Sequence, residues 1–353
     1  MRTVHIVLIA AAAASSMVFF APAGSHAGTI VGSGSISVWG RSTPYTSWDV
    51  LNDPLMGTVG LAEGRVRDFA FYNGRLYCLA STELQDGGPW YYTPGAAGSL
   101  ATPIQPAMPF PVGTPWRFVT TRALAINTGG HGYGAFSGPD PVLVGVGVPS
   151  ASGFPPQGFT LTQTAMNYAV GPLYSFPAPQ GFAPQSIEYI GSLDRFVTVE
   201  ADGPDPSRSV LNYHPHNAAG LLPRDSSVTL NIPGLKGITP VSAAFASMLS
   251  GQSITSESLL AIQKDNLGFS DPPRLYLLTL QGEVITQTDY VIPGWMQPRA
   301  IAVDEARGLI FTGDRELGQI HVLRVPAPGT GVLIAAAGLL AACRRRHASP
   351  QSK

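Results

Sequence analysis

Three aspartates follow predicted strands at matching positions, so their carboxylates could bind one metal ion jointly. Asp202, Asp265 and Asp314 come at or just after the ends of the apolar runs FVTVE, LLAIQ and LIFT. Carboxylate oxygens are ligands that Ca²⁺ and Mg²⁺ prefer. Asp also favours turns, because its side chain accepts hydrogen bonds from nearby backbone N–H groups. The sequence leaves both interpretations open and favours the turns.

Two histidines, His214 and His216, are two positions apart, so on a strand both rings would lie on one face. A metal site needs at least a third ligand, for which His131 or a carboxylate is a candidate. Pro215 lies between the two histidines and favours a turn instead. His321 alternates with apolar neighbours and is expected to be an ordinary strand residue.

Hairpins that recur along the chain would position these residues. Residues 298–314, PRAIAVDEARGLIFTGD, contain a predicted strand at Arg299–Val303, a turn at Asp304–Gly308 and a second strand at Leu309–Thr312. Related patterns begin near residues 67, 122, 185 and 241. One apolar residue near the start of each pattern recurs at intervals of 55 to 63 residues: Phe69, Leu124, Ile187, Ala243 and Ile301.

Repeated units of three or four short strands predict an all-β fold, a β-propeller. With 40 glycines, 32 prolines and only 12% charged residues, the chain is rich in turn formers. Five blades fit the body, Gly28–Val325, and Ser35–Gly40 is expected to add the missing strand to the last blade. Six blades are possible if Ile30–Val50 and part of Pro139–Ser175 form one more. A β-sandwich or a two-domain all-β protein is the alternative.

Residues 298–314 resemble the blades of the NHL and YVTN-type propeller families, in which a Pro precedes the inner strand and an Asp follows it before a Gly. The resemblance implies the fold and carries over no site residue. Among the predicted inner strands, Asp68 and Glu188 are the only clear acids. Motifs of serine hydrolases, zinc proteases and phosphate-binding loops are absent. The sequence therefore argues against an enzyme, and its only cofactor hypothesis is Ca²⁺ or Mg²⁺ at the three aspartates.

The first 27 residues are expected to be a secretory signal peptide. Arg2 and His5 begin it, Val7–Phe20 is apolar, and Ser25-His26-Ala27 offers small residues for cleavage after Ala27. A membrane anchor is the alternative reading of the apolar run.

The last segment, residues 326–353, places two prolines before an apolar run, Gly331–Cys343, and an arginine cluster after it. The arginines would stay on the cytoplasmic side of a membrane. The residues of this pattern are Pro326, Pro328, Arg344, Arg345 and Arg346.

This pattern resembles the PEP-CTERM sorting signal of Gram-negative bacteria, with Ala327 where that motif has Glu. The resemblance implies recognition by an exosortase-type transpeptidase, and the signal peptide implies transit through the Sec machinery. It also implies delivery to the cell envelope, the outer surface or the extracellular matrix. A hydrophobic helix retained as a simple anchor is the alternative.

Charge and cysteine content limit the partners of the body. The two ends hold five of the 21 Lys and Arg residues and none of the 22 acids, so the body has 16 basic and 22 acidic residues, a net charge of −6. Nucleic-acid binding needs a basic patch, so this balance argues against it. Cys78 is the single cysteine of the body, so no disulfide is expected within it.

Together these patterns predict an exported, non-catalytic binding or structural component of the cell surface, with matrix polysaccharide or envelope proteins as candidate partners. A propeller hydrolase acting on lactones or sugars around a central cation is the alternative. A generic surface domain without a small ligand fits the sequence equally well.

Overall fold

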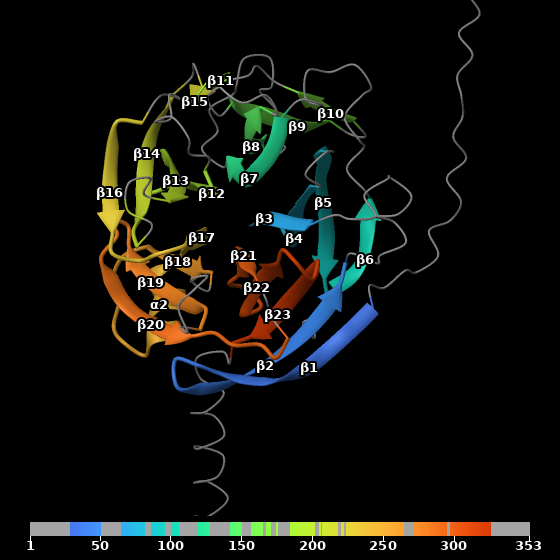
Figure 1. The fold of residues 1–353 in the computed structure, drawn as a ribbon, viewed down its shortest axis with the longest axis vertical. Coiled ribbons are helices and arrows are strands. Elements are labelled where there is room, and N and C mark those ends of the chain that lie inside the picture. The colour runs from blue at the N-terminus through green and yellow to red at the C-terminus, as the bar shows by residue number, and fades with distance from the viewer. Residues whose placement is uncertain are drawn as a thin grey trace, which may run out of the picture.

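The computed structural model describes residues 29–50, 65–81, 86–95, 100–105, 119–127, 142–149, 157–164, 167–170, 174–175, 184–201, 205, 207–217, 220–221, 224–264, 272–294 and 297–325 (Figure 1). The predicted signal peptide (1–27) and sorting tail (326–353) lie outside these residues, as do Asp202 and Asp265. Among the described residues, no helix has the length and apolar character needed to cross a membrane.

The described residues form five antiparallel sheets that surround one axis (Figure 1). The first sheet consists of β3 (Arg65–Tyr72), β4 (Arg75–Ser81), β5 (Asp86–Pro94) and β6 (Leu100–Gln105). The second consists of β7 (Val119–Asn127), β8 (Val142–Pro149), β9 (Gln157–Thr164) and β10 (Asn167–Val170), with β11 (Tyr174–Ser175) paired to β9.

The third sheet consists of β12 (Ser186–Ile190), β13 (Arg195–Ala201) and β14 (Ser209–Asn217), with β15 (Gly220–Leu221) and β16 (Ser226–Leu230) both paired to β14. The fourth consists of β17 (Leu235–Val241), β18 (Ser258–Gln263), β19 (Arg274–Thr279) and β20 (Val284–Asp289). The fifth runs in the order β21 (Pro298–Asp304), β22 (Leu309–Asp314), β23 (Gln319–Arg324), β2 (Arg41–Asp49) and β1 (Thr29–Val38).

The first strand of each sheet lies nearest the axis and contacts the first strand of the next sheet. These inner strands are β3, β7, β12, β17 and β21, and β21 contacts β3, so the ring is closed. A closed ring of radial sheets is a β-propeller, which confirms the predicted class of fold and excludes a sandwich for the described residues.

The hydrophobic core lies between neighbouring sheets. On β21, Ala300 and Ala302 pack with the first sheet, whereas Ile301 and Val303 pack with the fourth. Successive side chains of a strand point to opposite faces, so an inner strand with a sheet on each side buries both sets. This double burial explains why the strand is apolar without a break.

The hairpin at residues 298–314 has the predicted form. The turn is closed by Asp304, whose Oδ1 accepts the N–H of Arg307 at 3.2 Å. Gly308 has a φ of 67°, a left-handed conformation that glycine adopts without a steric penalty.

The N-terminal chain closes the propeller, as expected, but with a different strand. The predicted segment Ser35–Gly40 lies in β1 and the turn after it, at the outer edge of the fifth sheet. β2 is the strand that pairs with β23, from Tyr45 opposite Leu323 to Asp49 opposite Gln319. β2 was not predicted because its sequence, RSTPYTSWD, is mostly polar, without a regular alternation of apolar residues, and contains a proline.

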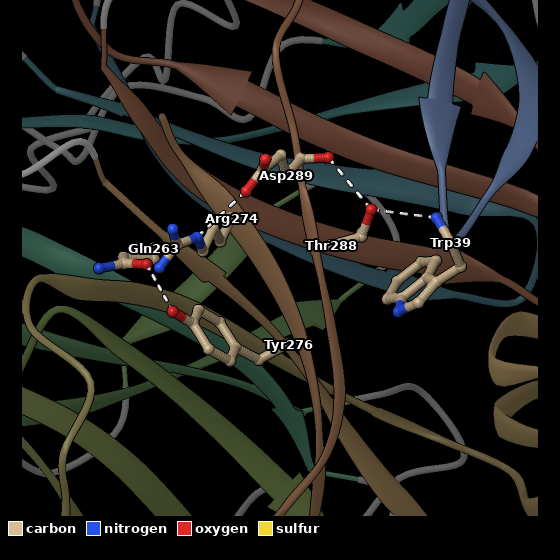
Figure 2. Close-up of polar contacts among 6 residues, drawn as sticks. All are labelled: Trp39, Gln263, Arg274, Tyr276, Thr288 and Asp289. Carbon is tan, nitrogen blue, oxygen red and sulfur yellow. Dashed lines mark hydrogen bonds and ion pairs between the residues drawn. The ribbon is translucent and has the colours of Figure 1, made fainter. Parts of the chain in front are cut away.

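The hairpin of β1 and β2 also contacts the fourth sheet. The N–H of Trp39 donates to Thr288 Oγ1 of β20 at 3.0 Å (Figure 2). The guanidinium of Arg41 donates to the carbonyl of Met248 at 2.7 Å. The N-terminal hairpin therefore joins two sheets as well as two ends of the chain.

One predicted strand pattern is wrong. The fourth inner strand was expected to contain Ala243, but β17 ends at Val241 and residues Ala243–Ser250 form helix α2. Ser242 caps this helix by accepting the N–H of Phe245 at 3.2 Å, and Gly251 ends it with a φ of 71°. The helix lies against the core between the fourth and fifth sheets, which buries Phe245 and Leu249. The apolar residue that corresponds to the other inner strands is Ile238.

Candidate binding site at the propeller axis

Four of the five inner strands carry a β-bulge at the same place, near their first residues. The register shifts lie between Val66 and Asp68, Thr121 and Ala123, Leu235 and Gly237, and Pro298 and Ala300. The extra residue is Arg67, Arg122, Lys236 or Arg299, respectively. A bulge redirects the side chain of its extra residue, and bulges are frequent beside functional sites.

The remaining inner strand, β12, has Gln185 at the equivalent place. Its N–H donates to Val199 O at 2.7 Å, and Ser186 then begins the strand. We refer to these five positions as the axial ring; for Arg122 the structure describes the backbone only. The axial ring consists of Arg67, Arg122, Gln185, Lys236 and Arg299.

Two side chains of the axial ring, those of Lys236 and Arg299, meet a third at Gln185. Its Oε1 accepts hydrogen bonds from Lys236 Nζ at 3.4 Å and from Arg299 Nη2 at 3.1 Å. Arg67 and Arg299 are only 4% and 5% exposed. Two cationic groups from neighbouring strands therefore converge on one neutral oxygen atom.

Asp68 ties the inner strands together next to the ring. Its carboxylate accepts the N–H of Phe69 at 3.0 Å, the N–H of Leu124 at 2.9 Å and the hydroxyl of Ser186 at 3.3 Å. Ser186 Oγ in turn accepts the N–H of Ile238 at 3.4 Å. Burial raises the pKa of Asp68 well above its ordinary value, while these donors and the charge of Arg299 act in the opposite direction. Four of the five inner strands are linked through this carboxylate and hydroxyl.

Glu188 lies near Asp68, so the fold brings together the two acids that the sequence placed on inner strands. Glu188 is two residues after Ser186 and therefore points to the same face of β12. Burial raises the pKa of Glu188, and the negative charge of Asp68 raises it further. Such a pair favours the protonated form of at least one carboxyl.

Asp314 lies at the end of the fifth sheet that carries the bulge at Arg299, because it pairs with Pro298. Its carboxylate accepts N–H groups of Gln297 at 3.1 Å, Glu316 at 2.9 Å and Leu317 at 2.9 Å. These bonds fit the turn interpretation. Among the residues the structure describes, no three His, Cys, Asp or Glu side chains are grouped to hold a metal. The set with Asp202 and Asp265 stays a prediction.

The histidine pair lies on a strand, since β14 continues through Pro215. The turn expected from Pro215 is therefore wrong. The ring of His214 is buried, with Nε2 3.0 Å from Thr198 Oγ1. The side chains of His216 and His131 lie outside the described residues. Cys78 is a free, buried thiol.

Further polar contacts lie at the ring end of the fourth sheet (Figure 2). Gln263 pairs with Leu235, directly beside the bulge at Lys236, and its Oε1 accepts the hydroxyl of Tyr276 at 2.8 Å. Farther out, Arg274 Nε donates to Asp289 Oδ1 at 3.1 Å. The same end of this sheet is thus polar from the inner to the outermost strand.

The sequence contained a signal for the axial ring that was missed. The apolar residues Phe69, Leu124 and Ile301 each have an arginine two positions earlier, and Ile187 has Gln185. The fourth unit has the same spacing, with Lys236 two positions before Ile238, but Ala243 offers a competing match for the apolar position.

No family model matches the chain, and no curated protein matches it. Solved structures with similar architecture include a glutaminyl cyclase from Myxococcus xanthus (12% identity, 74% of this chain and 90% of that chain, TM-score 0.44). They also include an auxiliary nutrient binding protein from Bacteroides ovatus (12%, 73% and 58%, 0.37) and a GH43 β-1,3-galactosidase (10%, 74% and 56%, 0.48). The matched part of the last two spans less than two thirds of their length. With TM-scores below 0.5, none of these similarities assigns an activity to this chain.

Proposed function

We propose that this chain is an exported, non-catalytic binding propeller of the cell envelope or extracellular matrix, with its ligand site at the axial ring. In this proposal each of the five described sheets is one blade. The observation that carries the proposal is the convergence of Lys236 and Arg299 on Gln185 at the start of three neighbouring inner strands. Rigid strands hold these side chains, as a preorganised binding site requires.

The proposed location rests on the two ends of the chain. A signal peptide cleaved after Ala27 would direct the chain to the Sec machinery, and residues 326–353 would be read by an exosortase-type transpeptidase. The negative body disfavours nucleic acid as a partner and leaves matrix polysaccharide or envelope proteins as candidates.

Deletion of residues 326–353 tests the sorting step. We expect the truncated protein to move from the envelope or matrix fraction to the periplasm or medium, as measured by cell fractionation and immunoblotting. Replacement of Arg344, Arg345 and Arg346 by alanine should have the same effect. Replacement of the exposed Arg324 on β23 is the control and should leave the location unchanged. Identical fractionation of all four proteins would refute the sorting proposal.

A cation-dependent hydrolase is a second candidate, favoured by the closeness of Asp68 and Glu188. A carboxyl with a raised pKa is suited to act as a general acid near neutral pH. In this candidate function, Asp202, Asp265 and Asp314 would hold Ca²⁺ or Mg²⁺. Metal analysis separates the two candidates: a stoichiometric divalent ion that raises the melting temperature supports the hydrolase, and its absence supports the binding protein.

A further inference from the structure

The outermost strand of the fifth sheet, β1, has one open edge. It pairs with β2 on one side, and no other strand of the described residues pairs with it. β1 spans ten residues, Thr29–Val38, and lies at the rim of the ring (Figure 1). An open edge presents a row of backbone N–H and C=O groups that can pair with a strand of another chain.

The sequence of β1, TIVGSGSISV, lacks the residues that usually protect such an edge. It contains no charged residue and no proline. The outermost strands of two other sheets differ, since β6 contains Pro103 and β20 ends at Asp289. Two apolar side chains of β1 are also largely exposed, Ile30 at 56% and Val31 at 47%. An uncharged edge with exposed apolar side chains favours pairing with another strand.

The hairpin turn determines which backbone groups of β1 face outward. The two turn residues, Trp39 and Gly40, have φ values of 47° and 71°, so the flanking residues Val38 and Arg41 form a hydrogen-bonded pair. From Val38 back to Gly32 the register with β2 is unbroken. Backbone groups alternate in direction along a strand, so those that point away from β2 belong to three exposed serines, Ser33, Ser35 and Ser37.

The regular stretch Gly32–Val38 is complementary to a second copy of itself. In an antiparallel pair centred on Ser35, the outward backbone groups of each serine meet those of a serine on the other strand. On the other face, Gly34 lies opposite Ile36 of the second copy, and Gly32 lies opposite Val38. Each branched side chain thus meets a glycine, and no like charges face each other across the pair.

We propose that two copies of this chain pair through β1, antiparallel and centred on Ser35, and form a symmetric dimer. The pairing joins two five-stranded sheets into one sheet of ten strands. The same strand serves both copies, as a twofold axis requires. Ile30 and Val31, which lie beyond the regular stretch, then reach the hairpin turn of the second copy. A single pair of strands is a small interface, so we expect the dimer to be reversible.

Disulfide cross-linking tests the centre of the pairing, in the full chain in detergent and with Cys343→Ser to remove the cysteine of the tail. Ser35→Cys should form a covalent dimer under mild oxidation, because opposite residues of a hydrogen-bonded pair have Cα atoms about 5.5 Å apart. The matched control is Ser33→Cys, whose two copies are roughly 14 Å apart, too far for a disulfide. Copies with Ser33→Cys mixed with copies with Ser37→Cys should cross-link, since the pairing places these positions opposite each other. Non-reducing gel electrophoresis measures the products.

Exchange of charge tests whether the pairing is specific. Ser35→Lys brings two like charges together at the centre and should weaken association about tenfold or more, and so should Ser35→Glu. A mixture of these two variants should associate again, because opposite charges then face each other. The control is Ser42→Lys, at an exposed serine of β2, which should leave association unchanged. Co-purification of differently tagged copies measures association, and every variant keeps the tail, so association through the tail would be equal in all of them.

Three results would overturn the dimer. They are failure of unaltered tagged copies to co-purify, equal association of Ser35→Lys and Ser42→Lys, and cross-linking of Ser35→Cys no faster than that of Ser33→Cys. If β1 instead pairs with an extended segment of a different protein, the chain stays monomeric and Ser35→Cys is not cross-linked, which also refutes the dimer. The inference goes beyond the proposed function, and its failure would leave ligand binding at the axial ring unaffected.

Discussion

At the scale of single residues, His321 is a titratable group at the contact between β23 and β2, the strands that close the propeller. It lies on β23, where its Nδ1 is 2.7 Å from Ser47 Oγ on β2, and its side chain is 1% exposed. Burial lowers the pKa of His321 from 6.5 to about 4. The imidazole of His321 is therefore neutral in the folded protein at pH values at which it would be charged in the unfolded chain.

The lowered pKa of His321 predicts acid destabilisation. Between about pH 6.5 and 4 the unfolded state binds more protons, so stability is present above this window and is lost as pH falls through it. At pH 4.5 the loss from this residue is about 2–3 kcal/mol relative to pH 7, at roughly 1.4 kcal/mol per pKa unit. Urea denaturation of the protein and of His321→Asn at both pH values measures it.

The variant His321→Asn should lose the part of the pH dependence of stability that comes from His321. Ser47→Ala is the control, since it removes the hydrogen bond but keeps the titrating group, and its pH dependence should match that of the unaltered protein. An equal loss of stability between pH 7 and 4.5 in the unaltered protein and His321→Asn would contradict the assignment.

At the scale of elements, close contact between inner strands limits which residues fit. A Cβ at Gly237 on β17 would lie 2.7 Å from the carbonyl oxygen of Arg299 on β21, and 3.1 Å from Ile301 Cγ2. Gly237 directly follows Lys236, so the same backbone approach brings Lys236 and Arg299 to Gln185. Packing of the inner strands and formation of the axial ring are therefore one structural requirement.

Gly237→Ala tests this requirement. The added methyl group forces the two inner strands apart, so we expect a loss of about 1–3 kcal/mol in the free energy of unfolding. Gly32→Ala on the outer strand β1 is the control, because its Cβ would meet Ser47 at an ordinary 3.7 Å, and its effect should stay within about 0.5 kcal/mol. Equal melting curves for the two variants would show that the inner strands can separate without cost.

Elements were predictable where the local sequence determined them. The turn at Asp304–Gly308 follows from an acid and a glycine, and the apolar strands on both sides of it from burial of both faces. Helix α2 was missed although Ser242 and Gly251 are good caps, because the run VSAAF also fits a strand. The sequence of one strand does not show that its residue belongs to the axial ring, because a bulge depends on pairing with the neighbouring strand. The shared spacing becomes visible only when the five units are compared.

At the scale of the whole molecule, closure joins residues 45–49 to residues 319–323. β2 completes the fifth sheet, and Trp48 is buried in the core that this sheet shares with the first. Without β2 the edge of β23 would present unpaired N–H and C=O groups, which promote association between chains. In the sequence, only the hydrophobic pattern of β1 indicated this closure. It predicted β1 as the strand that pairs with the last blade, whereas β2 is the strand that pairs with β23.

Two deletions separate the roles of the N-terminal strands. Removal of residues 29–49 exposes the edge of β23 and removes Trp48, whose loss from a core alone costs about 3–5 kcal/mol. We expect this protein to unfold or self-associate, as measured by light scattering after size-exclusion chromatography and by thermal melting. Removal of residues 29–35 leaves β2, Val38 and the contacts of Trp39 and Arg41 in place, so the shortened chain should be a folded monomer. If the larger deletion were also monomeric with an unchanged melting temperature, pairing of β2 with β23 would not be what closes the propeller.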